Sequence, residues 1–292
     1  MSHQDPISGV SVLSTGTVQI RPEHVGPTHK NTYQWLATSR EWTDPRPINA
    51  YVIEHRNGLV LFDTGQDRAS VTDPTYFPRG FTGLVYDRLA RFDIGPDQTL
   101  ARQLAALGHD IANVHTAVLS HLHQDHIGGL PELRHADIVV SDREWSSMMR
   151  PLAGLRGFLR SHIELTGLRW NRVHPEPLGD PGLAPFDAGH DLFGDGSLVV
   201  LPTPGHTPGS MSLLVRRPGH APLLLVGDLT YDADLLFAGH VPGVGNKRQM
   251  VEAAAAVGAL QQRLPGLTVL AAHDPAAADR LATSLAARPK SR

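Results

Sequence analysis

The sequence contains no cysteine, and this absence excludes several kinds of chemistry at once. Without a thiol, the chain can form no disulfide, no iron–sulfur cluster and no cysteine nucleophile. Any metal site must therefore use histidine, aspartate or glutamate. The redox state of the compartment stays open, because a protein without cysteine folds equally well on either side of a membrane.

Two further absences concern partners and location. No apolar run approaches the ~18 residues that a membrane-spanning helix needs, and residues 1–6 lack the basic and apolar regions of a signal peptide. The net charge of −3 and the pI near 6.6 disfavour nucleic acid or an anionic membrane as the main partner. We therefore expect a cytoplasmic protein that binds neither nucleic acid nor membranes.

The order of apolar segments predicts a layered α/β fold. Strands are expected at residues 50–54, 59–62, 116–120, 137–140, 197–201, 211–215, 222–226 and 267–272. Helices are expected at residues 84–92, 99–107, 127–133 and 249–264. No repeat or low-complexity linker interrupts the chain, so we expect a single domain over residues 1–292, with an N-terminal extension (1–47) and a helical insertion (143–170).

The segment His121-Leu122-His123-Gln124-Asp125-His126 carries the strongest chemical signal. Imidazole and carboxylate are ligand types that suit zinc and similar divalent ions. His121 and His123 can point the same way only where the backbone is extended, and Asp125 and His126 then turn away from them. One short loop is therefore expected to supply ligands for two metal ions.

Other candidate ligands also follow expected strands. Ligands placed at strand ends converge on one edge of a sheet, where rigid elements build a pocket. The polar residues in this position are Asp63, His121, His206, Asp228 and His273.

This set of residues, preceded by Asp63-Thr64-Gly65, resembles the metallo-β-lactamase superfamily across residues 48–275. The resemblance implies an αββα sandwich of two mixed β-sheets flanked by helices, with two metal ions at the sheet edge. Asp63 resembles the carboxylate that orients ligand histidines in this superfamily. The match assigns His121, His123 and His206 to the first ion, Asp125, His126 and His273 to the second, and Asp228 to a bridge between them.

Within the superfamily, the chain is most similar to the N-acyl-homoserine lactonases, the quorum-quenching branch. The spacing from His126 to His206, Asp228 and His273 is similar to theirs, and Tyr231 follows Asp228 by three residues, as in that branch. Other branches of the superfamily use a cysteine ligand, a basic helical C-terminal domain, basic RNA-binding surfaces or a flavin domain, and we expect none of these features in this sequence. Stretches 1–47, 67–98 and 143–170 look longer than a compact lactonase needs, so acyl-chain preference does not carry over.

The resemblance implies hydrolysis of a lactone by a hydroxide that the two ions share. Tyr231 is then expected to donate a hydrogen bond to the carbonyl oxygen, and Asp125 to deliver a proton to the leaving alkoxide. We expect two divalent ions, with zinc favoured over cobalt, manganese or iron. Another lactone, an aryl ester or an organophosphate triester is the alternative substrate, and a homodimer is left open.

Overall fold

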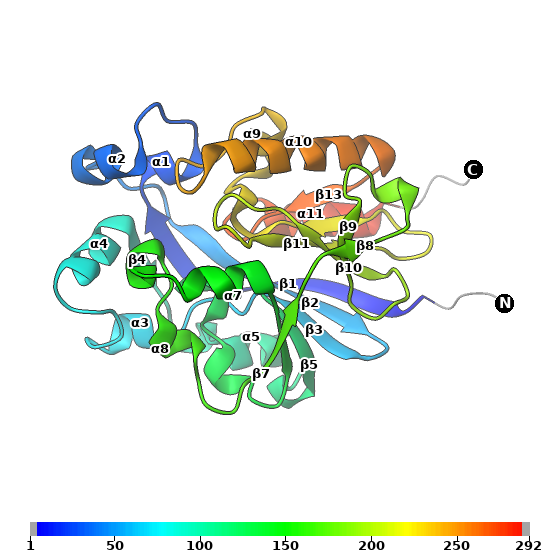
Figure 1. Cartoon of the computed structure of the whole chain (residues 1–292). Helices are drawn as coiled ribbons and strands as arrows, with labels where there is room; N and C mark the ends of the chain where they lie inside the picture. The colour runs from blue at the N-terminus through cyan, green and yellow to red at the C-terminus, as the bar shows by residue number, and fades with distance from the viewer. Residues whose placement is uncertain (1–4, 288–292) are drawn as a thin grey trace.

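Two mixed β-sheets form the centre of the protein in the computed structural model, which describes residues 5–287 (Figure 1). One sheet has seven strands in the order β4-β1-β2-β3-β5-β6-β7. These strands are β1 (Ile7–Ile20), β2 (Arg46–His55), β3 (Gly58–Phe62), β4 (Ala90–Asp93), β5 (Val114–Val118), β6 (Asp137–Ser141) and β7 (Arg169–Val173).

The second sheet has six strands in the order β13-β12-β11-β10-β9-β8. Its strands are β8 (Glu176–Pro177), β9 (Ala188–Asp191), β10 (Leu198–Pro202), β11 (Met211–Val215), β12 (Leu223–Leu225) and β13 (Thr268–Leu270). β12 and β13 run parallel, whereas the other pairs in this sheet are antiparallel.

Helices cover the outer faces of the two sheets, as Figure 1 shows for α10 over one sheet and α5 over the other. The α-helices are α1 (Pro22–Val25), α2 (Thr32–Thr38), α3 (Ala69–Thr72), α4 (Phe81–Leu89), α5 (Leu100–Ala106), α6 (Gln124–Ile127), α7 (Asp142–Met148), α8 (Arg160–Ile163), α9 (Ala233–Phe237), α10 (Lys247–Arg263) and α11 (Ala277–Ala286). Short 3₁₀ helices are η1 (Pro96–Gln98), η2 (Ile111–Asn113), η3 (Leu130–Glu132), η4 (Ala153–Arg156), η5 (Pro181–Leu183) and η6 (Gly227–Leu229).

Strand β3 shows how the sequence builds these layers. Successive side chains of a strand point to opposite faces of the sheet. In β3 they are buried on both faces. Phe62 packs between the sheets in the same cluster as Leu225, and Leu61 packs outward in the same cluster as Leu104 of α5. Val257 of α10 belongs to a third cluster, on the outside of the second sheet. The expected αββα sandwich is thus confirmed.

Two expected helices are partly wrong, and tertiary contacts explain both. The helix expected at 84–92 ends with α4 at Leu89, because residues 90–93 form β4 and pair with β1. The helix expected at 127–133 is replaced by α6 and η3. Gly128 and Gly129 lie between them in close contact with other loops, where a Cβ on Gly128 would be 2.0 Å from the amide nitrogen of Asp67.

The N-terminal stretch 1–47 contributes a strand to the sheet. β1 pairs with both β2 and β4, so it lies inside the seven-stranded sheet. Neither β1 nor α11 was expected from the sequence. Residues 143–170 contain most of α7, then η4 and α8, and the last two of them begin β7. Among residues 5–287, no helix combines the length and the apolar character needed to cross a membrane.

Candidate metal centre

The candidate ligands gather where the ends of the two sheets meet. The loop after β5 carries His121, His123, Asp125 and His126, whereas His206, Asp228 and His273 follow β10, β12 and β13 of the other sheet. Their ligand atoms form groups in which all atoms lie within 4.8 Å of one another. These groups are His121 with His123 and His206, Asp125 with His126 and His273, and His121 with His126 and Asp228.

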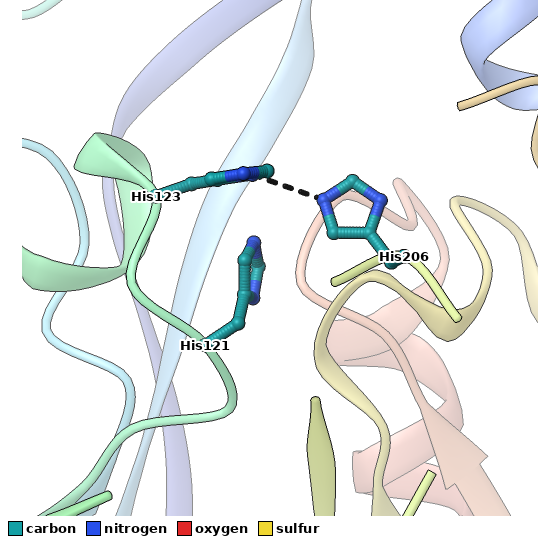
Figure 2. A group of neighbouring side chains, drawn as sticks. All are labelled: His121, His123 and His206. Carbon is teal, nitrogen blue, oxygen red and sulfur yellow. Dashed lines mark hydrogen bonds between the residues drawn. The ribbon is translucent and has the colours of Figure 1, made fainter. Parts of the chain in front are cut away.

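In the first group, three imidazole rings converge from two loops (Figure 2). His123 Nε2 lies 3.0 Å from the carbonyl oxygen of Arg156, and a carbonyl only accepts, so Nε2 carries the proton. The lone pair of His123 is therefore on Nδ1, which lies 3.0 Å from His206 Nε2. His121 Nδ1 contacts Ser120 Oγ at 3.0 Å, which leaves His121 Nε2 for the group.

In the second group too, each histidine makes a contact through the ring nitrogen that faces away from the group. His273 Nδ1 donates to the carbonyl oxygen of Pro47 at 2.9 Å, and its Nε2 lies 3.3 Å from Asp125 Oδ2. His126 Nδ1 lies 2.8 Å from Asp63 Oδ2, and its Nε2 lies 3.7 Å from Asp125 Oδ1. In both histidines the outer nitrogen is engaged, and the inner nitrogen points at the group.

Asp228 lies between the two groups. Its Oδ1 is 3.3 Å from His126 Nε2 and 3.5 Å from His273 Nε2, whereas its Oδ2 is 3.5 Å from His206 Nε2. The preceding Gly227 has φ +55°, and a Cβ there would lie 2.6 Å from Ser120. Glycine therefore allows the loop after β12 to approach the β5 loop closely enough for one carboxylate to face both groups.

Several inner atoms of this cluster are buried and unpaired, which tests whether the site fits metal ions. Within the described part of the chain, no hydrogen-bond partner is found for Nε2 of His121, His126 and His273, or for Asp228 Oδ1. A buried polar atom without a partner costs about 1–3 kcal/mol. Divalent cations would engage these lone pairs, and a set of nitrogen and carboxylate ligands suits zinc and related ions. The residues fit two such ions.

The electrostatics of the cluster divide its histidines: burial favours the neutral imidazole at His121 and His206, whereas the carboxylates of Asp228 and Asp125 outweigh burial and raise the pKa of His126 and His273. Burial lowers the pKa of His206 to about 3 and, together with the neighbouring His126, holds the pKa of His121 well below its usual value. Burial alone would raise the pKa of Asp228 and Asp125, but the charge of His126 lowers both. Neutral imidazoles and ionised carboxylates are the forms that bind metals.

Asp63 supports the cluster from the end of β3. Its backbone has φ +61°, an uncommon conformation for a residue other than glycine. Its carboxylate accepts from the Ser120 amide at 2.7 Å and from Ser120 Oγ at 2.8 Å, in addition to its contact with His126. Asp63 thus contacts His126 directly and reaches His121 through the Ser120 hydroxyl.

Tyr231 places a phenol beside the cluster. Its O–H donates to Asp228 Oδ2 at 2.9 Å, and its ring stacks on His273 with centroids 5.4 Å apart. Burial and the charge of Asp228 raise the pKa of Tyr231 well above its usual value, so the phenol keeps its proton at neutral pH. The side chain is therefore a hydrogen-bond donor at this site.

Two buried residues near the cluster were missed by the sequence analysis. Glu144, on α7, contacts both ligand loops, and His24, on α1, lies edge-on to Trp35 and Tyr231 with centroids 4.9 and 6.2 Å away. Burial lowers the pKa of His24 to about 4. A single glutamate in the first turn of a helix resembles any solvated residue, so the sequence offered no signal for Glu144.

Comparisons with known proteins show which family this chain belongs to. The family model of the metallo-beta-lactamase superfamily matches residues 43–273. N-acyl homoserine lactonase AttM of Azorhizobium caulinodans is 33% identical over 232 residues, which is 78% of this chain and 82% of that protein.

Two solved structures share the fold. A mutant of B. thuringiensis AiiA with N-decanoyl-L-homoserine bound at its active site superposes with a TM-score of 0.72 at 18% identity, covering 94% of this chain and 95% of that one. AidC, a dizinc quorum-quenching lactonase solved with a product, gives a TM-score of 0.57 at 16% identity, covering 93% and 90%. The family model matches most of the length of this chain, and the fold is the same. This chain therefore belongs to the metallo-β-lactamase superfamily.

Proposed function

We propose that this protein is a metal-dependent hydrolase that opens the lactone ring of N-acyl-homoserine lactones. One observation carries the proposal, namely that two groups of metal-ligand side chains face the same carboxylate, Asp228, with the O–H of Tyr231 beside it. The similarity to AttM over most of both chains supports this choice of substrate.

The proposed ligands follow the two groups. His121, His123 and His206 would hold the first ion, Asp125, His126 and His273 would hold the second, and Asp228, which faces both groups, would serve as a ligand shared between them. We propose zinc, which AidC carries, although the same ligand types also accept cobalt, manganese or iron. When bound, a pair of such ions lowers the pKa of water toward about 7 and polarises a carbonyl group.

Tyr231 is proposed to stabilise the charge that develops on the lactone carbonyl oxygen. The phenol is protonated and buried, and in this structure its hydrogen goes to Asp228 Oδ2. A substrate carbonyl placed over the site can take that hydrogen bond as negative charge builds on its oxygen. A donor held in a buried site needs little reorganisation at the moment of reaction.

Asp125 is proposed to move the proton to the leaving group. Its side chain is 20% exposed, whereas Asp228 is 4% exposed, so Asp125 is the cluster carboxylate that a substrate can reach. When the ring C–O bond breaks, the ring oxygen leaves as an alkoxide and needs a proton. Asp125 Oδ2, next to His273 Nε2, can accept the proton that the attacking water gives up and pass it to this oxygen.

The proposal is tested by measuring proton release from a panel of substrates with zinc-loaded protein. The panel contains short- and long-chain N-acyl-homoserine lactones, γ-lactones, an aryl ester and a phosphotriester. We expect kcat/KM above about 10⁴ M⁻¹s⁻¹ on the acyl-homoserine lactones, a range typical of true substrates. Chelated protein is the matched control. Higher efficiency on the aryl ester or phosphotriester would reject the proposed substrate class.

A further inference from the structure

Helix α7 buries a carboxylate that the proposed reaction does not use. The helix begins after β6, where Ser141 Oγ accepts from the amide of Arg143, and Glu144 lies in its first turn with an exposed fraction of 0%. Burying an ionised carboxylate is costly unless several donors surround it. The position of Glu144 therefore depends on the donors that it meets.

Those donors belong to the two loops that carry the first group of histidines. Glu144 Oε1 accepts from the Leu122 amide at 3.1 Å, and Leu122 stands between His121 and His123. Glu144 Oε2 accepts from Thr207 Oγ1 at 2.7 Å and from the Gly209 amide at 3.0 Å. Thr207 directly follows His206, so one carboxylate joins loops from two different sheets.

The loop after β10 has little room to move relative to α7. A Cβ on Gly209 would lie 2.1 Å from the backbone nitrogen of Glu144. Thr207 Oγ1 also lies 2.7 Å from Ser210 Oγ, so the hydroxyl that reaches Glu144 is oriented within its own loop. The close packing and the two hydrogen bonds that Glu144 accepts from Thr207 and Gly209 act together on the position of His206.

The second group of ligands is held by other contacts. Asp63 holds His126, and the carbonyl of Pro47 holds His273. Within the described residues, the hydrogen bonds of the Glu144 side chain go to Leu122, Thr207 and Gly209, and none goes to a residue of the second group. A change at Glu144 should therefore act on one ion site more than on the other.

We propose that Glu144 is a positioning residue that sets the spacing of His121, His123 and His206, and thereby controls affinity for the first ion. This inference rests on the proposed metal centre. The side chain acts through two loops, and the effect is selective because Asp63 and the carbonyl of Pro47 hold His126 and His273.

Glu144→Gln is the informative variant because it keeps the size of the side chain. Its amide NH₂ replaces one acceptor oxygen and meets the N–H and O–H donors of the loops, so at least one hydrogen bond is lost. Thr207→Val removes the hydroxyl that Glu144 accepts from, and its effect should not add to that of Glu144→Gln. Glu164→Gln, at a partly exposed glutamate paired with Arg160, is the matched control.

Cobalt binding to metal-free protein is measured by visible absorption with a competing chelator at pH 8. His273→Ala lacks a ligand of the second site and reports on the first, whereas His206→Ala reports on the second. We expect Glu144→Gln to weaken cobalt binding about tenfold in the His273→Ala background. In the His206→Ala background we expect a change below about twofold, and Glu164→Gln should change neither.

Unchanged cobalt affinity in the His273→Ala background would overturn the positioning role. An equal loss in both backgrounds would also overturn it, because that result indicates general destabilisation rather than selective positioning. A failure of the unmodified protein to bind two equivalents of cobalt is a different outcome, since it rejects the proposed metal centre itself. Thermal unfolding of each metal-free variant checks that the chain remains folded.

Discussion

At the scale of single residues, a contact at the outer nitrogen orients the rings of His123, His126 and His273. His123 and His273 donate to the carbonyl oxygens of Arg156 and Pro47, and His126 contacts Asp63. These partners fix ring orientation and tautomer before any ion arrives. The inner nitrogens are thus preorganised toward the cluster by the groups that hold the rings from behind.

Replacing Tyr231 with phenylalanine tests the role of the phenol. The ring can still stack on His273, but the O–H that lies 2.9 Å from Asp228 Oδ2 is removed. We expect kcat on an acyl-homoserine lactone to fall about ten- to a hundredfold, because a donor to the developing oxyanion is lost. Metal content by elemental analysis should stay the same. A kcat equal to that of the unmodified protein would contradict the assigned role.

Glu144 should also make stability depend on pH. Burial raises its pKa to about 7, above the usual value of 4.5, so the folded protein binds a proton more tightly than the unfolded chain. The stability that this proton contributes is complete below pH 4.5 and is lost as pH rises through about 7. Relative to Glu144→Gln, which cannot titrate, the metal-free protein should lose about 3 kcal/mol between pH 5 and 8.

Urea unfolding of both metal-free proteins at several pH values measures this difference. The same pH dependence in the two proteins would show that Glu144 does not titrate in this range. A difference that grows in favour of the unmodified protein at high pH would contradict the sign of the shift.

At the scale of secondary-structure elements, the segment from η4 to α8 packs on His123. Gly157 follows η4 with φ +89°, and a Cβ there would lie 2.3 Å from His123 Cδ2. The neighbouring carbonyl of Arg156 accepts from the same ring. This segment therefore belongs to the wall of the site, although it lies more than thirty residues away along the chain.

Gly157→Ala should displace His123 and lower kcat/KM at least about tenfold. Gly108→Ala is the control, because Gly108 has φ +85° and, within the described chain, a Cβ there meets no atom within 4 Å. Both substitutions place alanine at positive φ and should cost about 1 kcal/mol in the free energy of unfolding. Lactonase assays and urea unfolding separate the two effects. Equal activity in the two variants would show that the contact with His123 is unimportant.

At the scale of the whole molecule, the cluster joins the two sheets. The loop after β5 belongs to one sheet, and the loops that carry His206, Asp228 and His273 belong to the other. Ions bound here would link the sheets and engage buried atoms that otherwise lack partners among residues 5–287. Binding to the folded state alone stabilises it by mass action.

Removing metal should therefore lower thermal stability. At a free zinc concentration about 100 times Kd, one bound ion adds about 2.7 kcal/mol, so chelated protein should melt at least about 5 °C below the zinc-loaded form. Calorimetry after dialysis against a chelator gives this difference, and adding zinc should restore it. Identical melting temperatures would count against a metal centre that spans both sheets.

The sequence alone determined the types of the candidate ligands, because a chain without cysteine leaves imidazole and carboxylate groups for a metal site, and it predicted most strands from their apolar runs. The tertiary structure decided which side chains support the ligands. Asp63 at φ +61°, the Arg156 and Pro47 carbonyls, and Glu144 act through contacts between distant segments. The pattern of apolar and polar residues in a short segment reflects only its local preference for helix or strand. The pairing of β1 with β4, and the contacts that support the candidate ligands, depend on segments that only folding brings together.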